Sequence, residues 1–259
     1  MSTSFLKDDD LPTVDVAIQD QHTDIVNLKF TKFIQQLILT QHYERNIRTI
    51  VVSAAQAPVA GNTIILPQAT HHVQFEIVSV TPVGNNYSIL LDTPLPNNIE
   101  KDLLLKEVTN HIQVDGSVTP VVFSIDMADI ETSIAYDLTL IKLHILDNAE
   151  MDDSKFGGIN SLTNGIVLRV VNNNVINNIC NIKNNTDLAN IFGQVEYKTK
   201  APSGYYGITA TMIMQSLFGV GVVTRLTSET NDRIELVVQD NLTGLTHLHA
   251  IGAGHVTLD

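Results

Sequence analysis

Histidine is the residue type in this chain that could bind a transition metal, and two histidines stand in a suitable pattern. His247 and His249 are two positions apart, so on a β-strand their side chains lie on the same face. Two imidazoles on one face can bind zinc, but a third ligand has to come from another part of the chain. His71 and His72 are adjacent, and adjacent side chains of a strand point to opposite faces. The sequence therefore predicts no metal site, and the alternative is a hidden one built from His247, His249 and the loop around Asp152.

Acidic residues form two clusters. Segment 147–153, Asp-Asn-Ala-Glu-Met-Asp-Asp, is rich in oxygen ligands. It lacks the alternating ligands, the central glycine and the terminal glutamate of an EF-hand loop, so we expect a capped turn there instead of a calcium site. Asp8, Asp9 and Asp10 are expected to form a solvated tail. No pair of carboxylates stands out for glycoside hydrolysis, because their separation in space cannot be read from the sequence.

No nucleophile has the neighbours that catalysis would require. Cys180 stands among apolar residues and asparagines without a nearby histidine to activate its thiol, and we expect a small buried side chain. The chain contains no Gly-x-Ser-x-Gly elbow, phosphate-binding loop or dinucleotide fingerprint. Tyr205 and Tyr206, flanked by Gly204 and Gly207, could stack on a sugar or serve as contact anchors. We therefore predict a protein that is not an enzyme, with no catalytic residues and no cofactor.

The composition favours a protein that works through its surface. The 259 residues are 44% hydrophobic, which is enough for well-packed cores, but only 17% charged. The formal net charge of −13 argues against specific binding to nucleic acid or to anionic membranes. No apolar run approaches the roughly 20 residues that span a bilayer. The single cysteine excludes an intrachain disulfide, and the N-terminus lacks a signal-peptide pattern, so we expect a soluble protein made in a reducing cytoplasm.

Short runs of β-branched and aromatic residues, separated by Asn, Gly and Pro, fill most of the chain and predict an all-β fold. Residues 25–40 fit either a helix or a strand, and we favour a strand for the first half. Residues 172–190 hold nine Asn among nineteen residues, which indicates a hairpin with amide-rich turns or else an amide-lined recognition surface. The clearest predicted strands are 64–66, 73–80, 87–91, 138–146, 165–171 and 233–239.

The spacing of these strands predicts two β-sandwich or barrel-like domains preceded by an extended N-terminal arm. Residues 18–116 would form the first domain and residues 117–259 the second, a β-sandwich, because the segment around 117 is short and turn-rich. Proline biases the arm, residues 1–17, toward extended geometry. We expect the arm to dock on a neighbouring subunit through Asp8, Asp9, Asp10, Leu11 and Pro12.

Six segments of the second half are distinctive: 115–123 (DGSVTPVVF), 151–159 (MDDSKFGGI), 162–169 (LTNGIVLR), 200–207 (KAPSGYYG), 238–245 (VQDNLTGL) and 252–256 (GAGHV). With them, residues 112–259 resemble proteins encoded among the virion structural genes of tailed bacteriophages. These segments are turn and strand patterns. The resemblance therefore implies a component of the phage particle and supplies no catalytic residues.

The resemblance and the missing chemistry lead to the same expectation. We expect a non-enzymatic structural protein, a ring-forming adaptor in the neck or tail, near the head–tail connection. Its partners would be copies of itself and other virion proteins of the portal, tail or capsid, and its location the virion, assembled in the bacterial host cytoplasm. The alternatives are a head-surface decoration protein and a carbohydrate-binding module of a phage receptor or fibre apparatus.

Overall fold

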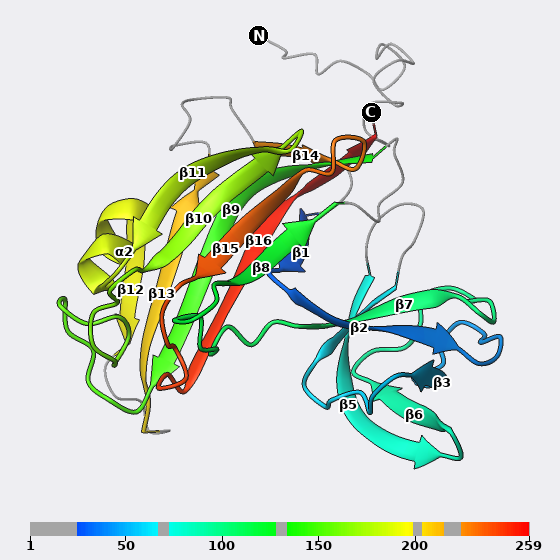
Figure 1. The fold of residues 1–259 in the computed structure, drawn as a ribbon. Helices are drawn as coiled ribbons and strands as arrows, with labels where there is room; N and C mark the ends of the chain where they lie inside the picture. Colours follow the sequence, from blue (N-terminus) through cyan, green and yellow to red (C-terminus); the bar gives the residue numbers. More distant parts are fainter. Residues whose placement is uncertain (1–24, 67–72, 128–133, 199–203, 215–223, 259) are drawn as a thin grey trace, which may run out of the picture.

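The computed structural model describes residues 25–66, 73–127, 134–198, 204–214 and 224–258 (Figure 1). The all-β prediction is confirmed, because the described residues form sixteen strands and one short helix. The expected docking arm, with Asp8, Asp9, Asp10, Leu11 and Pro12, lies outside the described residues, as does the pair His71 and His72.

The strands divide between a sandwich and a barrel. Those of the sandwich are β1 (Ile25–Lys29), β8 (Val121–Asp126), β9 (Ile134–Asp147), β10 (Ile166–Asn172), β11 (Val175–Ile182), β12 (Gln194–Lys198), β13 (Tyr206–Ile213), β14 (Thr224–Thr227), β15 (Arg233–Val238) and β16 (His247–Leu258). Those of the barrel are β2 (Lys32–Leu39), β3 (Thr49–Ala54), β4 (Thr63–Leu66), β5 (Val73–Val83), β6 (Asn86–Leu91) and β7 (Leu104–Thr109).

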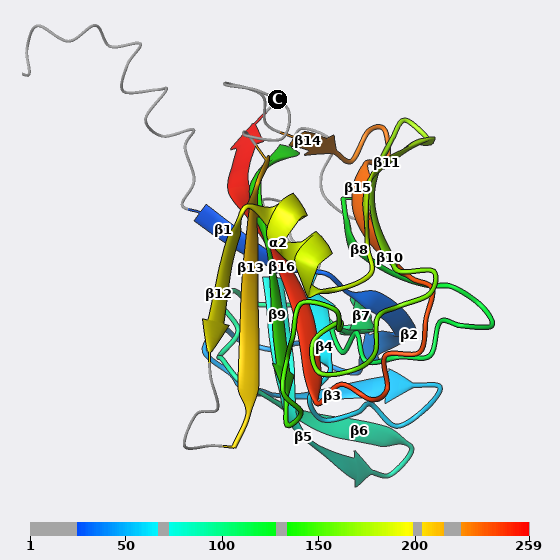
Figure 2. The same cartoon turned by 90° about the vertical axis from the view of Figure 1, so that its left-hand side faces the viewer.

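Two antiparallel sheets form the two layers of the sandwich. The larger sheet has the order β1-β16-β9-β13-β12, with β14 paired to part of β9, and the smaller sheet has the order β11-β10-β15-β8 (Figures 1 and 2). Alternation along β9 buries Leu143 and Ile145, whereas Lys142 and His144 point away from the core. The larger sheet therefore has one apolar face and one face that carries polar side chains.

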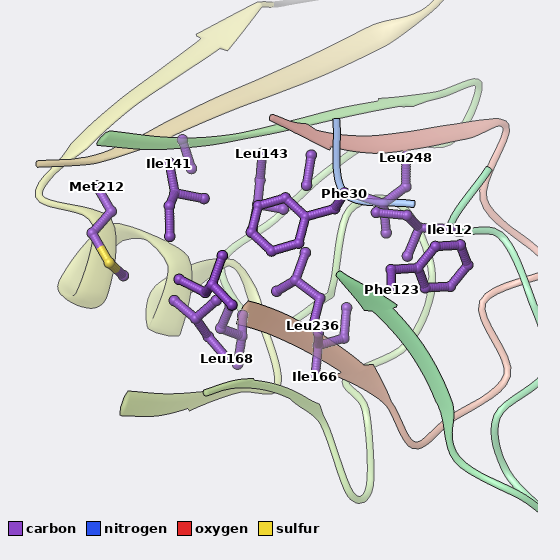
Figure 3. Close-up of a cluster of buried hydrophobic side chains, with 14 of the residues drawn as sticks. Phe30, Ile112, Phe123, Ile141, Leu143, Ile166, Leu168, Met212, Leu236 and Leu248 are labelled. Atoms are coloured by element: carbon purple, nitrogen blue, oxygen red, sulfur yellow. The ribbon is translucent and has the colours of Figure 1, made fainter. Parts of the chain in front are cut away.

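Apolar side chains from both layers fill the sandwich core (Figure 3). Phe30, which follows β1, is fully buried between the two sheets. A large apolar side chain buried in this way contributes about 1.5–3 kcal/mol to folding. Around Phe30 lie Ile141, Leu143 and Leu248 of the larger sheet and Ile166, Leu168 and Leu236 of the smaller sheet.

The barrel is closed and has its own core. Its strand order is β2-β3-β6-β5-β4-β7, and β7 returns to pair with β2. Inward-facing residues on alternate positions, such as Leu37 and Leu39 of β2, are fully buried. The buried residues of this core are Leu37, Leu39, Tyr43, Ile50, Val52, Ile64, Leu66, Phe75, Ile77, Ile89, Leu91, Leu95, Ile99 and Leu105.

The barrel is inserted into the sandwich, which differs from the expected division at 116/117. Strand β1 pairs with β16, with Ile25 opposite His255 and Lys29 opposite Ile251. Leu28, Phe30 and Ile112 belong to the sandwich core, although all three fall within the first predicted domain. Pairing between the first and last described strands is a long-range contact, and local alternation carries no trace of it. The two strands β1 and β2 also resolve the ambiguous segment 25–40 as strand throughout most of its length.

The Asn-rich segment forms a hairpin followed by a helix. Asn173 and Asn174 make the β10–β11 turn with positive φ angles of 47° and 62°, as the predicted amide-rich hairpin requires. The end of the segment is instead helix α2 (Asn185–Phe192), which the sequence pattern did not reveal. Asn184 caps α2 by accepting a 2.8 Å hydrogen bond from the backbone N–H of Asp187. The helix lies at the open side of the sandwich, between β11 and β12 (Figure 2).

Candidate functional site

The outside of the barrel carries a row of apolar side chains that solvent reaches. On β2, Phe33, Ile34 and Ile38 are 56%, 42% and 41% exposed, and on β7 Leu104 is 47% exposed. We call these four residues the β2–β7 stripe. Exposed apolar residues that gather on one surface commonly mark a contact with another protein.

The pairing of β2 with β7 explains why these residues face outward. Ile38 lies directly opposite Leu104, and Phe33 lies opposite Val108. A register shift between Phe33 and Gln35 places an additional residue on β2, so that Phe33 and the neighbouring Ile34 are both exposed. The stripe is therefore a consequence of one bulge and of an apolar cross-strand pair.

A small cleft separates the base of the stripe from the sandwich. Phe33, Ile65 and Val108 line it from the barrel, and Leu28 and Ile125 line it from the sandwich. The charged residues that line it are Lys29, Lys106 and Asp126. The loop before β8 lies beside the start of β2, and its Val118 is 92% exposed. Apolar and charged side chains are therefore mixed at the junction of the two domains.

A buried carboxylate joins β7 to its neighbours inside the barrel. Glu107 is fully buried and accepts hydrogen bonds from Gln35 Nε2 at 2.7 Å, Asn62 Nδ2 at 2.6 Å and the backbone N–H of Val59 at 2.9 Å. Gln35 in turn accepts a 3.1 Å bond from the backbone N–H of Gln56. Buried charge is tolerated when hydrogen bonds replace water in this way, so the network holds strands together.

Histidines from distant strands meet on the outer face of the larger sheet. His249 on β16 lies directly opposite His144 on β9, and His144 lies opposite Thr209 on β13. His247 and His249 share this face, as their spacing predicts, and their rings are 4.8 Å apart between centroids. The rings of His144 and His249 are 5.1 Å apart. We call His144, His247 and His249 the histidine cluster.

Hydrogen bonds fix the rings of the histidine cluster. Nε2 of His247 lies 2.7 Å from Nδ1 of His249. The hydroxyl of Thr209 lies 3.0 Å from Nδ1 of His144. Burial is the largest cause of a lowered pKa at His249 and acts together with the nearby His247, His144, Lys29 and His111, so that the pKa falls to about 4.

The same causes act on His247. Burial comes first and the neighbouring His111 second, and both lower the pKa of His247. Both shifts favour the uncharged form of the two rings. The sequence revealed the His247–His249 pair. Only the pairing of β9 with β16 shows that His144 lies beside this pair, and only the path of the chain from the barrel to the sandwich brings His111 near it.

The loop around Asp152 does not join the histidine cluster. Asp152 accepts hydrogen bonds from the backbone and hydroxyl of Ser154, at 2.9 and 2.6 Å, and pairs with Lys155 at 3.3 Å. The bonds from Ser154, together with Lys155, lower the pKa of Asp152. This is the capped turn that the sequence predicts. In the described part of the chain, no three His, Cys, Asp or Glu side chains converge as a preformed metal site.

Tyr205 and Tyr206 stand at the start of β13, away from the amide-rich turn. Tyr205 is 39% exposed, and Tyr206 lies opposite Asp147 at the end of β9. The β10–β11 turn lies near the other end of β9. The backbone N–H of Asn173 donates to Asp232, which also accepts a hydrogen bond from Thr227 of β14, and β14 pairs with the beginning of β9. The structure therefore does not bring the two tyrosines and the β10–β11 turn together. A sugar site at Tyr205 and Tyr206 stays a prediction.

Cys180 lies on β11 and is partly buried. Burial raises the pKa of its thiol to about 11. Because the thiolate is the reactive form, this thiol is poorly suited to nucleophilic chemistry.

Comparison with known proteins gives no family for this chain. No protein-family model matches the sequence, and no curated protein matches it significantly. None of the helices in the described ranges is long and apolar enough to span a bilayer.

Proposed function

We propose that the chain is a non-enzymatic structural component of a tailed-phage virion and serves there as a ring-forming adaptor of the neck or tail. In this function, copies of the chain bind each other and neighbouring portal, tail or capsid proteins. Its location would be the virion, after assembly in the bacterial cytoplasm. The mechanism is assembly, in which apolar surface is removed from water at each contact between subunits.

The observation that carries this proposal is the β2–β7 stripe. A closed barrel has no free strand edge, so side chains are what its wall offers to a partner. Four large apolar residues, each more than 40% exposed, stand on two paired strands of this wall. Burying them against a second copy removes their apolar area from water, which stabilises association by about 25 cal/mol per Å².

Charge and composition add to the argument. The chain carries a formal charge of −13, which would let DNA pass a ring of subunits without binding to it. The four residues of the stripe are uncharged, but Gln36 and Lys106 lie opposite each other on the same face between them, so a partner that covers the stripe must also accommodate the charge of Lys106. The resemblance of residues 112–259 to virion structural proteins gives the biological setting.

The mass of the untagged protein in solution tests the proposal. Native mass spectrometry should show a closed ring, and the double variant Ile38→Asp/Leu104→Asp should be monomeric. Val83→Asp is the matched control, because Val83 is 49% exposed but lies on β5 of the same barrel. A ring that survives the double variant, or that Val83→Asp also disrupts, would contradict a role for the stripe.

A wild-type monomer at every concentration would contradict the adaptor. Binding of that monomer to finished capsids would instead indicate a head-surface decoration protein. Saturable binding on a glycan array, lost in Tyr206→Ala, would indicate a carbohydrate-binding module. Removal of residues 1–17 tests the arm, and a ring that forms equally well without them would refute its docking function.

A further inference from the structure

We propose that strand β11 pairs edge to edge with β11 of a second copy of the chain, in antiparallel orientation about a two-fold axis. β11 is an outer strand of the smaller sheet, and β10 is its one neighbour among the described strands (Figure 1). The residues of the stretch 175–178 are all exposed, so no described element covers this half of the strand. Such pairing is independent of the proposed role in a virion.

β11 lacks the charged residues that usually protect an edge strand. An exposed edge offers unpaired N–H and C=O groups to any extended chain, and proteins commonly place a charge or a proline there. The eight residues of β11, VINNICNI, include neither. The other outer strands that the structure describes in the sandwich each carry a charge: Lys29 on β1, Asp126 on β8, Glu196 on β12 and Arg225 on β14. The edge of β11 is therefore the one suited to pairing with another strand.

The β10–β11 turn determines which backbone groups of β11 face outward. This two-residue turn, with positive φ at both positions, makes Asn172 and Val175 a hydrogen-bonded pair. Hydrogen-bonded and non-hydrogen-bonded pairs alternate along an antiparallel ladder, so the N–H and C=O groups of Ile176 and Asn178 point away from β10. The pairing with β10 then skips Ile179, and this bulge ends the regular edge. The edge thus offers one donor and one acceptor from each of two residues.

A two-fold axis through Asn177 pairs these groups with their own copies. Antiparallel pairing about this residue sets Ile176 opposite Asn178 of the second copy, and Asn178 opposite its Ile176. Each pair can exchange two backbone hydrogen bonds, because both residues present their N–H and C=O groups outward. Val175, which is 59% exposed, comes to lie opposite Ile179 of the second copy, and its apolar surface is removed from water.

The side chain at the two-fold axis is suited to facing itself. Asn177 is exposed and would form the central non-hydrogen-bonded pair, in which the Cα atoms are about 4.5 Å apart. A carboxamide both donates and accepts, so two asparagines can hydrogen-bond to each other, whereas two identical charges would repel. This self-complementarity indicates a second copy of the chain as the occupant of the edge.

The contact is expected to be weak between free chains. It covers only a few residues of each strand, and hydrogen bonds that replace bonds to water contribute little net free energy. The formal charge of −13 on each copy also opposes their approach. In an assembly that holds two copies side by side, the same pairing becomes effectively intramolecular and is strengthened.

Disulfide trapping in the full untagged chain tests the register. Asn177→Cys is combined with Cys180→Ser, so that the new thiol is the only one in the chain. The two Cα atoms at the axis lie within the range that a disulfide bridges, so mild oxidation should give a covalent dimer, seen by intact mass. Trapping should be at least about tenfold faster than for a thiol that meets its copy only by collision.

Two matched variants control for collision, each combined with Cys180→Ser. Asn178→Cys lies on the same exposed stretch, but its two copies would form a diagonal pair about 7–8 Å apart, too far for a disulfide. Gln194→Cys is exposed on β12, an outer strand of the other sheet. Both should form the covalent dimer slowly.

Ile176→Pro separates pairing from folding. The N–H of this residue points away from β10, so proline removes a donor from the contact between copies and none from the β10–β11 ladder. Added to the Asn177→Cys chain, it should slow trapping to the rate of the controls and leave thermal unfolding nearly unchanged. The proposal is overturned if Asn177→Cys is trapped no faster than Asn178→Cys or Gln194→Cys, or if folded Ile176→Pro leaves its trapping unchanged.

Discussion

Replacement of Phe30 by alanine should destabilise the sandwich and leave the barrel unchanged. Phe30 precedes the barrel strands directly, yet its ring is fully buried between the two sandwich sheets. Its backbone N–H donates a 3.0 Å hydrogen bond to the carbonyl of Ala250, next to the β1–β16 pairing. The ring is therefore part of the sandwich, although the chain continues at once into β2.

The expected size of the effect follows from burial. A Phe→Ala change in a core costs about 3–5 kcal/mol through lost transfer free energy and the cavity that remains. For a domain of this size, 1 kcal/mol shifts Tm by about 2–4 °C, so the sandwich transition should fall by about 6–20 °C. Phe75→Ala is the counterpart in the barrel, because Phe75 is 2% exposed and belongs to the other core.

Differential scanning calorimetry combined with hydrogen exchange distinguishes the two domains. Phe30→Ala should lower the protection of backbone amides against hydrogen exchange in β9, β10, β15 and β16 and leave the six barrel strands protected. Phe75→Ala should lower protection in the barrel strands and leave the sandwich strands protected. Phe33→Ala is the surface control, because Phe33 is 56% exposed and its loss should change stability by less than about 0.5 kcal/mol. If Phe30→Ala lowered protection equally in the barrel, the division into two cores would be wrong.

Three further predictions follow from other sites. Gly116→Ala would place a Cβ against the backbone carbonyl of Val238 and should lower the free energy of unfolding by about 1–3 kcal/mol. The urea midpoint should fall while the m-value stays unchanged. An unchanged midpoint would show that the linker can move away from β15. Glu107→Ala leaves three buried donors without an acceptor and should lower barrel stability by at least about 1–3 kcal/mol. Glu100 is exposed, so Glu100→Ala should leave the stability nearly unchanged. Equal effects of the two substitutions would refute the contribution of the network. The rate of Cys180 alkylation by iodoacetamide, measured by intact-mass spectrometry, should keep rising above pH 9.0 and up to about pH 11, because the raised pKa keeps the thiolate scarce at lower pH. A rate that reaches a plateau near pH 9.0 would contradict this.

Local patterns predicted most of the strands but not their partners. The runs 64–66, 87–91 and 138–146 all lie within observed strands, because alternation and β-branched residues act within a few positions. Membership of β1 in the sandwich depends on β16, at the far end of the chain. Helix α2 was not predicted because asparagine, which disfavours helix interiors, dominates the segment. The helix is anchored instead by the buried Leu188 and Phe192, which pack in the sandwich core.

The two surface features could be predicted only in part. Period-two spacing placed His247 and His249 on one face, but the position of His144 beside them depends on the β9–β16 register. The joint exposure of Phe33 and Ile34 depends on a β-bulge between Phe33 and Gln35, and no residue type in that segment predicts a bulge. Local spacing therefore identified only the His247–His249 pair, and long-range register decided which residues join it and which apolar side chains form the stripe.

The pairing of β1 with β16 has a consequence for biosynthesis. The barrel strands end at Thr109, so the ribosome releases a complete barrel long before residues 247–258 emerge. Until then β1 lacks β16, its partner among the described strands, and Leu28 and Phe30 lack the layer that will cover them. On a polysome, a neighbouring nascent chain offers the same partner surface, so exchange of β1 between two molecules is the misfolding route that this topology favours.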